Sequence, residues 1–105
     1  MGKYRFFHIG KNKPKYGTQD KSMQGEPNSF LDTYRKKNGR FHSRRKYGTD
    51  GNAVVDLDVA TAVHSEDHAH DINGNNRSKD RPLTKKERRE INKAKRKRRF
   101  WNNGK

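Results

Sequence analysis

The middle of the chain alternates apolar and polar residues with a period of two, which is typical of β-strands whose side chains point to opposite faces in turn. In residues 53–59, one face carries the apolar members of the run, Val55, Leu57 and Val59. The other face carries Asp56 and Asp58 side by side. We expect the apolar face to be the core face.

Turn sequences connect this run to two earlier ones. Asp50-Gly51 lies between the β-rich runs Phe41–Tyr47 and Ala53–Val59, and glycine supplies the positive φ that a tight hairpin turn needs. The turn sequence Lys-Lys-Asn-Gly separates residues 29–34 from the first of these runs. The pattern therefore predicts a three-stranded antiparallel meander.

The register of this meander decides which cations lie beside the two aspartates. One register places Arg44 and Lys46 next to Asp56 and Asp58, and the other places Arg45 and Tyr47 there. Cross-strand ion pairs are the simplest role for these aspartates in either case.

The C-terminal part of the chain carries a helix signal. Thr84 and Glu87 have the spacing of a capping box, in which each side chain accepts a hydrogen bond from the other residue's backbone N–H. A helix over residues 85–99 follows, and ten of its fifteen residues are Lys or Arg. Few apolar residues accompany it: Leu83, Ile91, Ala94, Phe100 and Trp101. Because so many positive charges repel one another, we expect this helix to be ordered mainly when it is bound to phosphates.

These elements divide the chain into three parts. Residues 1–28 contain several glycines and prolines and are expected to form an irregular basic arm. Residues 29–76 form the β-rich core, and residues 77–105 form the basic helix and tail. The predicted fold class is a small α+β domain with an antiparallel sheet of three or more strands.

Composition limits the size of the core and the class of protein. Of 105 residues, 26% are hydrophobic and 37% are charged, so we expect one small folded unit with loosely structured arms. No apolar run approaches the roughly 18–20 residues of a membrane span, and the first residues lack the apolar region of a secretory signal. There is no cysteine, which excludes disulfides, thiolate nucleophiles and cysteine-based metal sites.

The net charge of +15 predicts a polyanionic partner, with nucleic acid (RNA or DNA) ahead of an anionic membrane surface. The charge is uneven, because residues 1–48 and 84–105 are strongly basic whereas residues 49–76 contain six acids and no Lys or Arg. This acidic segment could be a chemical site between basic arms, or it could simply neutralise those arms within the fold. The candidate nucleic-acid contacts are the helix cations and two aromatic side chains: Lys85, Arg88, Arg89, Lys93, Arg96, Arg98, Arg99, Tyr47 and Trp101.

Histidines cluster in the acidic segment. His64, His68 and His70 lie within seven residues and titrate near neutral pH when unperturbed. They could transfer protons in metal-independent RNA cleavage, which needs no cofactor. Alternatively, His68 and His70 on one strand face could hold a divalent metal together with Asp56 and Asp58. A solvated polar loop is the third interpretation.

The order of the short motifs resembles one toxin family. The matching segments are Pro27-Asn28-Ser29, Asp32-Thr33-Tyr34, Asn38-Gly39, the run Arg44 to Ala53, Asp56-Leu57-Asp58, His64 and His68-Ala69-His70. This order resembles the "bacterial toxin 24" C-terminal domains of bacterial polymorphic toxins, which are also found attached to phage head proteins. That family is grouped with the barnase, EndoU, colicin and RelE-like ribonucleases, and the resemblance covers residues 27–71.

The resemblance implies a ribonuclease-like fold that acts on RNA without a required metal. It implies acid/base roles for His64, His68 and His70 and phosphate or transition-state contacts for Arg44 and Arg45. Asp56 and Asp58 would orient or support them. This chain departs from the family pattern at Asp67, where the family has proline, and in its appended basic helix.

We therefore expect a nucleic-acid-binding protein, either a ribonuclease-like toxin or a phage-associated module. The alternative is a non-enzymatic ribosomal or virion protein whose basic arms follow RNA or DNA. A toxin would be complemented by an acidic immunity protein, because opposite charge speeds association. The expected location is the cytoplasm of a target or host cell, or a virion.

Overall fold

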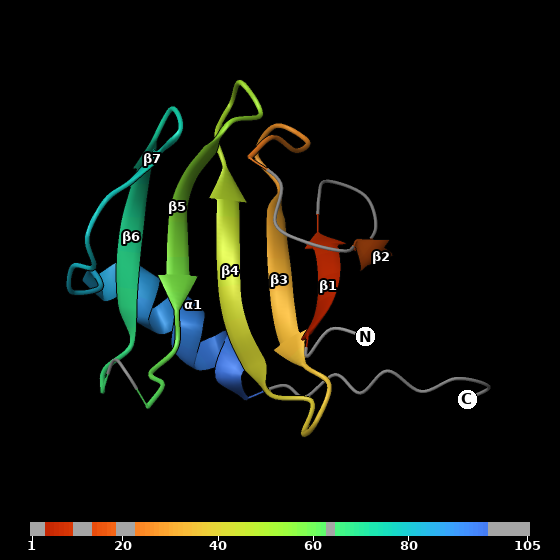
Figure 1. The fold of residues 1–105 in the computed structure, drawn as a ribbon, viewed down its shortest axis with the longest axis vertical. Coiled ribbons are helices and arrows are strands. Elements are labelled where there is room, and N and C mark those ends of the chain that lie inside the picture. Colours follow the sequence, from red (N-terminus) through yellow and green to blue (C-terminus); the bar gives the residue numbers. More distant parts are fainter. Residues whose placement is uncertain (1–3, 10–13, 19–22, 63–64, 97–105) are drawn as a thin grey trace.

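One antiparallel sheet and one helix make up the part of the chain that the computed structural model describes, residues 4–9, 14–18, 23–62 and 65–96. The strand order is β2-β1-β3-β4-β5-β6-β7, and α1 lies behind the sheet (Figure 1). The elements are β1 (Tyr4–Ile9), β2 (Pro14–Thr18), β3 (Phe30–Arg35), β4 (Phe41–Tyr47), β5 (Ala53–Asp58), β6 (His68–Asn73), β7 (Asn76–Arg77) and α1 (Lys85–Lys95). This architecture confirms the predicted α+β class.

The predicted meander is strands β3, β4 and β5, which pair antiparallel in that order. Glycines at both turns adopt the left-handed conformation, Gly39 with φ of 70° and Gly51 with φ of 83°. A Cβ on Gly51 would lie 2.7 Å from the carbonyl oxygen of Gly25, so close packing as well as φ requires glycine there. Both predicted hairpins are confirmed.

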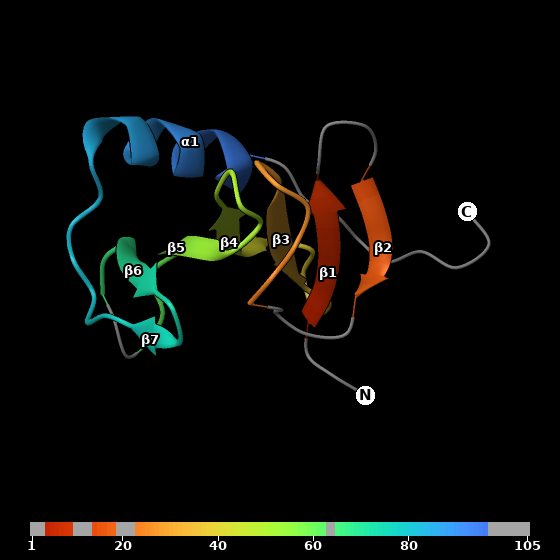
Figure 2. The same ribbon diagram turned by 90° about the horizontal axis from the view of Figure 1, so that it is seen from above.

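The helix-covered face of the sheet contains the larger core. It is built from Tyr34, Phe41, Val55, Leu57, Val59, Ala69, Leu83, Ile91 and Ala94. The three apolar residues of the β5 run are therefore core residues, as their alternation predicted. Figure 2 shows α1 along this face, with β1 and β2 beyond it.

Helix α1 begins at the predicted capping box. The Glu87 backbone N–H donates to Thr84 Oγ1 at 3.1 Å, and the Thr84 backbone N–H donates to Glu87 Oε1 at 2.9 Å. The helix ends at Lys95 with Arg96 as its C-cap, which is earlier than the predicted residue 99. Ile91 and Ala94 bury against the sheet, so packing stabilises the helix where we had expected bound phosphate to do so.

Glu90 connects α1 to the sheet. Its two carboxylate oxygens accept hydrogen bonds from Arg44 at 2.8 Å and from Lys46 at 3.0 Å. Arg44 also forms a two-point ion pair with Asp32 at 2.7 and 2.9 Å, and its guanidinium lies 3.9 Å from the ring centre of Phe30. Arg44 is thereby fixed on the helix side of the sheet.

The opposite face is half apolar and half polar. Its apolar part is built from Leu31, Tyr47, Ala53 and Ile72, with Phe6 and Met23 packed against it. Its polar part includes Arg45 and Asp56, which pair directly across β4 and β5. The observed register puts Arg45 rather than Arg44 beside Asp56, as in the second of the two possible registers, but Asp58 is opposite Ser43, and Tyr47 is opposite Ala53.

The prediction that the N-terminal arm is irregular is wrong for two segments, which form strands β1 and β2. β1 pairs with β3 along its whole length, from Tyr4 opposite Arg35 to Ile9 opposite Phe30, and β2 pairs with β1. The β1 sequence is rich in aromatic residues, which favour strands, and β3 has an edge available for pairing. Pro14 is the first residue of the edge strand β2, a position at which proline is tolerated in sheets.

Among the described residues, no helix combines the length and the apolar character that crossing a membrane requires.

Candidate functional site

The strand registers bring Asp58, His68 and His70 together on the face opposite α1. Asp58 on β5 is directly opposite His68 on β6, and Asp56 is directly opposite His70. Since side chains of paired residues share a face, both histidines and both aspartates point the same way. The prediction that His68 and His70 share one strand face with the aspartates is confirmed.

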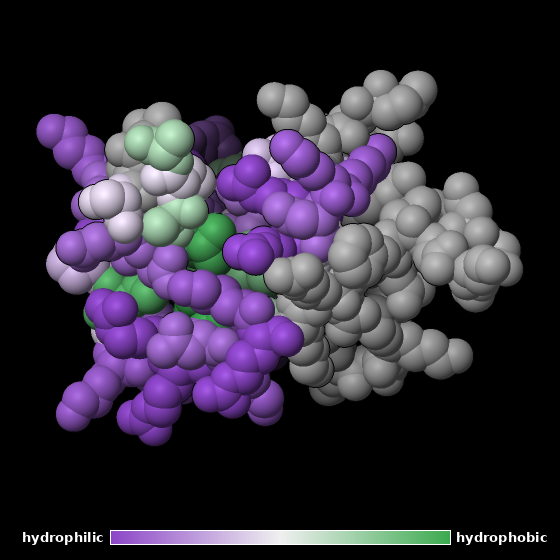
Figure 3. Space-filling model, turned by 90° about the horizontal axis from the view of Figure 1, so that it is seen from below, coloured by the Kyte–Doolittle hydropathy of each residue, from purple (hydrophilic) through white to green (hydrophobic). Residues whose placement is uncertain are grey.

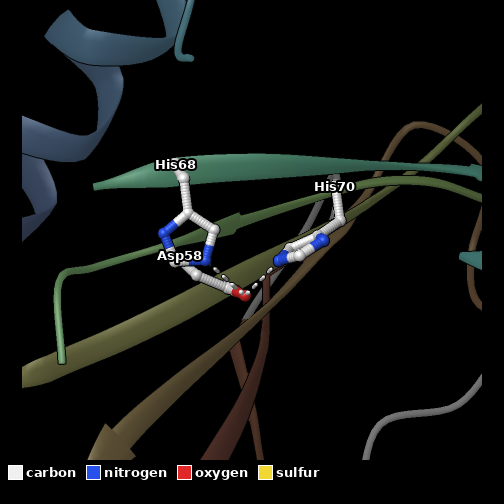
Figure 4. A group of neighbouring side chains, drawn as sticks. All are labelled: Asp58, His68 and His70. Carbon is white, nitrogen blue, oxygen red and sulfur yellow. Dashed lines mark ion pairs between the residues drawn. The ribbon is translucent and has the colours of Figure 1, made fainter. Parts of the chain in front are cut away.

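Both imidazoles approach one oxygen atom (Figure 4). His68 Nε2 and His70 Nε2 each lie 3.7 Å from Asp58 Oδ2. The two rings are nearly perpendicular, with centres 4.9 Å apart. His68 and His70 are 6% and 8% exposed, so the group is largely withdrawn from bulk water.

The backbone sets the orientation of each ring. His68 Nδ1 lies 2.8 Å from the carbonyl oxygen of Glu66, and His70 Nδ1 lies 2.9 Å from that of Ser78. A carbonyl oxygen can only accept, so each Nδ1 carries the proton and donates it. In a neutral ring the lone pair is then on Nε2, the atom that faces Asp58.

Two arginines surround the aspartates. Arg45 donates to Asp56 from Nε at 2.7 Å and from Nη2 at 2.8 Å, in an almost completely buried pair. Arg77 donates from Nε to Asp56 at 2.9 Å and from Nη2 to Asp58 Oδ2 at 2.8 Å. The hydrogen bond to Asp56 raises the pKa of Arg45 above its ordinary value, although burial opposes this.

Arg77 is a site residue that the sequence analysis missed. The turn after β6, in which Gly74 has φ of 65°, returns the chain so that Arg77 pairs with Ile72. The turn-forming sequence Asn-Gly-Asn-Asn at residues 73–76 was the signal that could have predicted this hairpin. With 42% of its side chain exposed, Arg77 is the most exposed member of the group.

Buried oxygens without hydrogen bonds extend from the site into the sheet. Asp58 Oδ1, Ser43 Oγ and Thr33 Oγ1 make no hydrogen bond to any residue that the structure describes. Ser43 is opposite Asp58, and Thr33 is opposite Ser43, so the three form one row across β5, β4 and β3. Such groups have unused capacity to accept a hydrogen bond or, for Asp58, to bind a cation.

The remaining predicted site residues are distributed as follows. The described side chains that lie close enough together to hold a metal ion are Asp58, His68 and His70. Asp56 is not among them: it is 0% exposed, and both its oxygens accept hydrogen bonds from arginines. Its predicted role as a metal ligand is therefore wrong, because arginine guanidinium groups already occupy it. Arg44 lies on the other face of the sheet, bound to Asp32 and Glu90, and is kept away from the histidines. His64 lies outside the described residues.

The predicted nucleic-acid contacts divide into three groups. The helix cations that the structure describes are exposed: Lys85, Arg88, Arg89, Lys93 and Arg96. Tyr47 is 3% exposed and belongs to the smaller core, so its predicted stacking on bases is wrong. Arg98, Arg99 and Trp101 lie outside the described residues.

A cavity of about 510 Å³ lies beside the C-terminal end of α1. Figure 3 shows this end of the molecule as a hydrophobic hollow within a hydrophilic rim. The lining combines cations with apolar side chains: Arg35, Asn38, Arg40, Phe41, Val59, Ala60, Asp67 and Lys95. Lys95 Nζ lies 2.9 Å from Asp67 Oδ2, which leaves Arg35 and Arg40 as the cations of the rim.

No family model, curated protein or solved structure matches this chain. The resemblance to the polymorphic-toxin domains therefore stays a prediction.

Proposed function

We propose that this protein binds RNA and cleaves it at the group formed by Asp58, His68 and His70. The observation that carries the proposal is the convergence of two imidazole Nε2 atoms on one carboxylate oxygen, at 3.7 Å each. Each ring donates from Nδ1 to a backbone carbonyl, so Nε2, which faces Asp58, is the nitrogen that would exchange a proton with RNA. Paired imidazoles of this kind can provide one general base and one general acid.

The reaction uses the 2′-hydroxyl of RNA as its nucleophile. One neutral imidazole removes the 2′-hydroxyl proton as the 2′-oxygen attacks phosphorus. The bond from phosphorus to the 5′-oxygen breaks, and the other imidazole, in its protonated form, donates a proton to that oxygen. The products are a 2′,3′-cyclic phosphate and a 5′-hydroxyl end, and no metal or other co-reactant is consumed.

The charged neighbours have separate roles in this proposal. Asp58 stabilises whichever imidazole is protonated, because its carboxylate faces both rings. Arg77 is half-exposed and bound to Asp58, so it is the cation that an incoming phosphate meets first. Arg45 is buried and donates a hydrogen bond to Asp56, which it positions. Asp56 in turn accepts a hydrogen bond from Arg77 and holds it in place.

The exposed cations of α1 would hold the RNA chain by its phosphates on the other face of the sheet from the histidines, so the bound chain would have to pass around an edge of the sheet to reach them. The cavity beside the helix adds Arg35 and Arg40, together with the aromatic side chain of Phe41, which also contributes to its lining. These features bind RNA without reading its sequence.

The test is incubation of the protein with labelled single-stranded RNA in EDTA. Wild type is expected to cleave, and His68→Ala and His70→Ala are each expected to reduce the rate at least 100-fold, within the usual range for general acid–base catalysis. His42→Ala is the matched control, since His42 lies on β4 and stacks on Tyr4 instead of facing Asp58. Equal rates for wild type and the His68 and His70 variants would overturn the proposal.

Binding without cleavage is the second candidate function. It is favoured by two observations: His68 and His70 have small exposed fractions, and the exposed cations of α1 lie on the other face of the sheet from them. Tight, salt-sensitive binding of RNA that stays intact in the same assay would establish it.

The proposed biological setting is a toxin or a phage-associated module. Its support is the motif order together with the net charge of +15. An acidic protein that covers the basic surface would then be its natural inhibitor.

A further inference from the structure

We propose that Asp58, His68 and His70 also bind a divalent transition-metal ion, with Zn²⁺ as the preferred ion, and that this ion switches the site off. Metal binding follows from the geometry alone. The inhibitory effect rests on the proposed ribonuclease function.

The donor set matches the chemistry of zinc. Two imidazole nitrogens and one carboxylate oxygen are common zinc ligands, and their ligand atoms all lie within 4.8 Å of one another. Ligand atoms on a tetrahedral zinc lie about 3.3 Å apart, given metal–ligand bonds of about 2.0 Å. Both imidazoles are already 3.7 Å from Asp58 Oδ2, so small ring movements bring these pairs to that separation.

The hydrogen bonds from the Nδ1 atoms of both rings have the arrangement that zinc-binding histidines have. A ligating histidine usually donates its other ring N–H to a carbonyl or carboxylate, which fixes the ring and directs the lone pair at the metal. His68 donates from Nδ1 to the carbonyl of Glu66, and His70 donates to that of Ser78. Because backbone carbonyls hold both Nδ1 atoms, the orientation of each ring that coordination needs is already fixed before an ion binds.

Asp58 supplies the third ligand, and its other oxygen gives an independent argument for a cation site. Its Oδ1 is buried and accepts no hydrogen bond from any described residue, although the carboxylate is 15% exposed overall. Its Oδ2 is shared with the Nη2 atom of Arg77 at 2.8 Å. Arg77 therefore occupies part of the place of a metal ion and competes with one, and 42% of its side chain is exposed to solvent.

Metal binding and proton transfer need the same atoms. An ion held by both Nε2 atoms uses the lone pairs that would accept or carry the proton during RNA cleavage. A bound Zn²⁺ ion would therefore inhibit cleavage, and a chelator would restore it.

The test of binding uses the full chain after removal of metal with EDTA and buffer exchange. Zn²⁺ affinity is measured by competition with a chromophoric chelator, and ligand geometry by the absorption spectrum of bound Co²⁺. We expect His68→Gln, His70→Gln and Asp58→Asn each to weaken Zn²⁺ binding at least tenfold, whereas His42→Gln leaves it unchanged. Arg77→Gln is expected to tighten binding severalfold, because it removes the competing cation.

The opposite response of Arg77→Gln keeps the proposal testable if a ligand variant fails to fold. Zn²⁺ affinity that is unchanged in the ligand variants, or equal in wild type and Arg77→Gln, would overturn the site. A shift of the His68 and His70 ring resonances in the NMR spectrum on adding Zn²⁺ to wild type would support it without any substitution.

Cleavage assays separate this proposal from the proposed function. Cleavage in EDTA that Zn²⁺ abolishes supports both. Zn²⁺ binding to a protein that never cleaves RNA supports the metal site and overturns the ribonuclease. Cleavage in EDTA that saturating Zn²⁺ leaves unchanged, or that occurs only with the ion present, overturns the inhibitory role.

Discussion

Arg45 and Asp56 are cross-strand neighbours on β4 and β5, joined by two hydrogen bonds of 2.7 and 2.8 Å and almost completely buried. His70 occupies the next position in the same row, opposite Asp56 on β6. The pair therefore lies directly beside the candidate site and supports it from within the sheet. Arg77 then links Asp56 to Asp58.

Asp56→Ala should strongly destabilise the fold. The substitution leaves the guanidinium of Arg45 buried without its partner, and breaking a buried ion pair in this way costs about 3–5 kcal/mol. Urea denaturation measures the loss in free energy of unfolding. Val54→Ala on the same strand is the control, because Val54 is 42% exposed and should change stability by less than about 0.5 kcal/mol. Equal effects of the two substitutions would contradict the structural role of the pair.

Arg44→Lys should lower stability without affecting RNA cleavage. Lysine cannot reproduce the two-point contact with Asp32 and the additional bond to Glu90, and the lost charged hydrogen bonds are worth about 1–3 kcal/mol. Arg44 faces α1, on the other side of the sheet from the histidines. The check is a thermal denaturation curve together with a cleavage rate measured well below the unfolding temperature. A large fall in rate for fully folded Arg44→Lys would place Arg44 in the catalytic machinery after all.

Acid should unfold the protein partly through Glu87. Hydrogen bonds from Arg81, with help from the backbone of Thr84, hold the pKa of Glu87 at about 2, although burial opposes this. A carboxyl whose folded pKa is lowered stabilises the fold above its unfolded pKa of about 4.3, and this contribution is lost as the pH falls toward 2. The full shift corresponds to about 3 kcal/mol, and solvent screening of this partly exposed pair reduces the contribution to on the order of 2 kcal/mol.

The free energy of unfolding, measured in urea between pH 6 and pH 2, should therefore fall less steeply for Glu87→Gln than for wild type. Glu66→Gln is a suitable control, because Glu66 is exposed and makes no ion pair with the residues that the structure describes. Parallel curves for Glu87→Gln and wild type would show that the Arg81–Glu87 pair does not contribute as described.

The cations of α1 should control the salt dependence of RNA binding. Replacing Lys86, Arg89 and Lys93 by Gln removes three exposed charges. On single strands each phosphate contact contributes about 0.7 to the slope of log K against log salt, so the slope should become shallower by about 2. Fluorescence anisotropy with labelled RNA at several salt concentrations measures it, with Lys79→Gln, an exposed lysine outside the helix, as the control. An unchanged slope in the triple variant would exclude this surface as the contact.

The sequence was informative where local rules decide the structure. The two-residue alternation placed Val55 and Leu57 in the core, the Asp50-Gly51 turn located a hairpin, and Thr84 marked the start of the helix. Each of these depends on neighbours in the chain, so the local pattern was sufficient.

Contacts between distant segments decided the rest. The alternation alone could not choose between Arg44 and Arg45 as the partner of Asp56, because that choice depends on the bulge between Lys46 and Tyr47. Strand β1 forms by pairing with β3, a segment more than twenty residues away, and Arg77 reaches the site only through the β6–β7 hairpin. Of the predicted histidines, the sequence correctly placed His68 and His70 on one face with Asp58.

The most direct test of the central claim is to compare RNA with its 2′-O-methyl analogue of the same sequence, both incubated with the protein in EDTA. Proton transfer by His68 and His70 to and from RNA predicts that only the unmodified strand is cut, and that mass spectrometry finds a 2′,3′-cyclic phosphate on the 5′ fragment. The same fragment should be missing with the His68→Ala, His70→Ala double variant. Cleavage of both strands, or RNA that remains intact while bound, would contradict the claim.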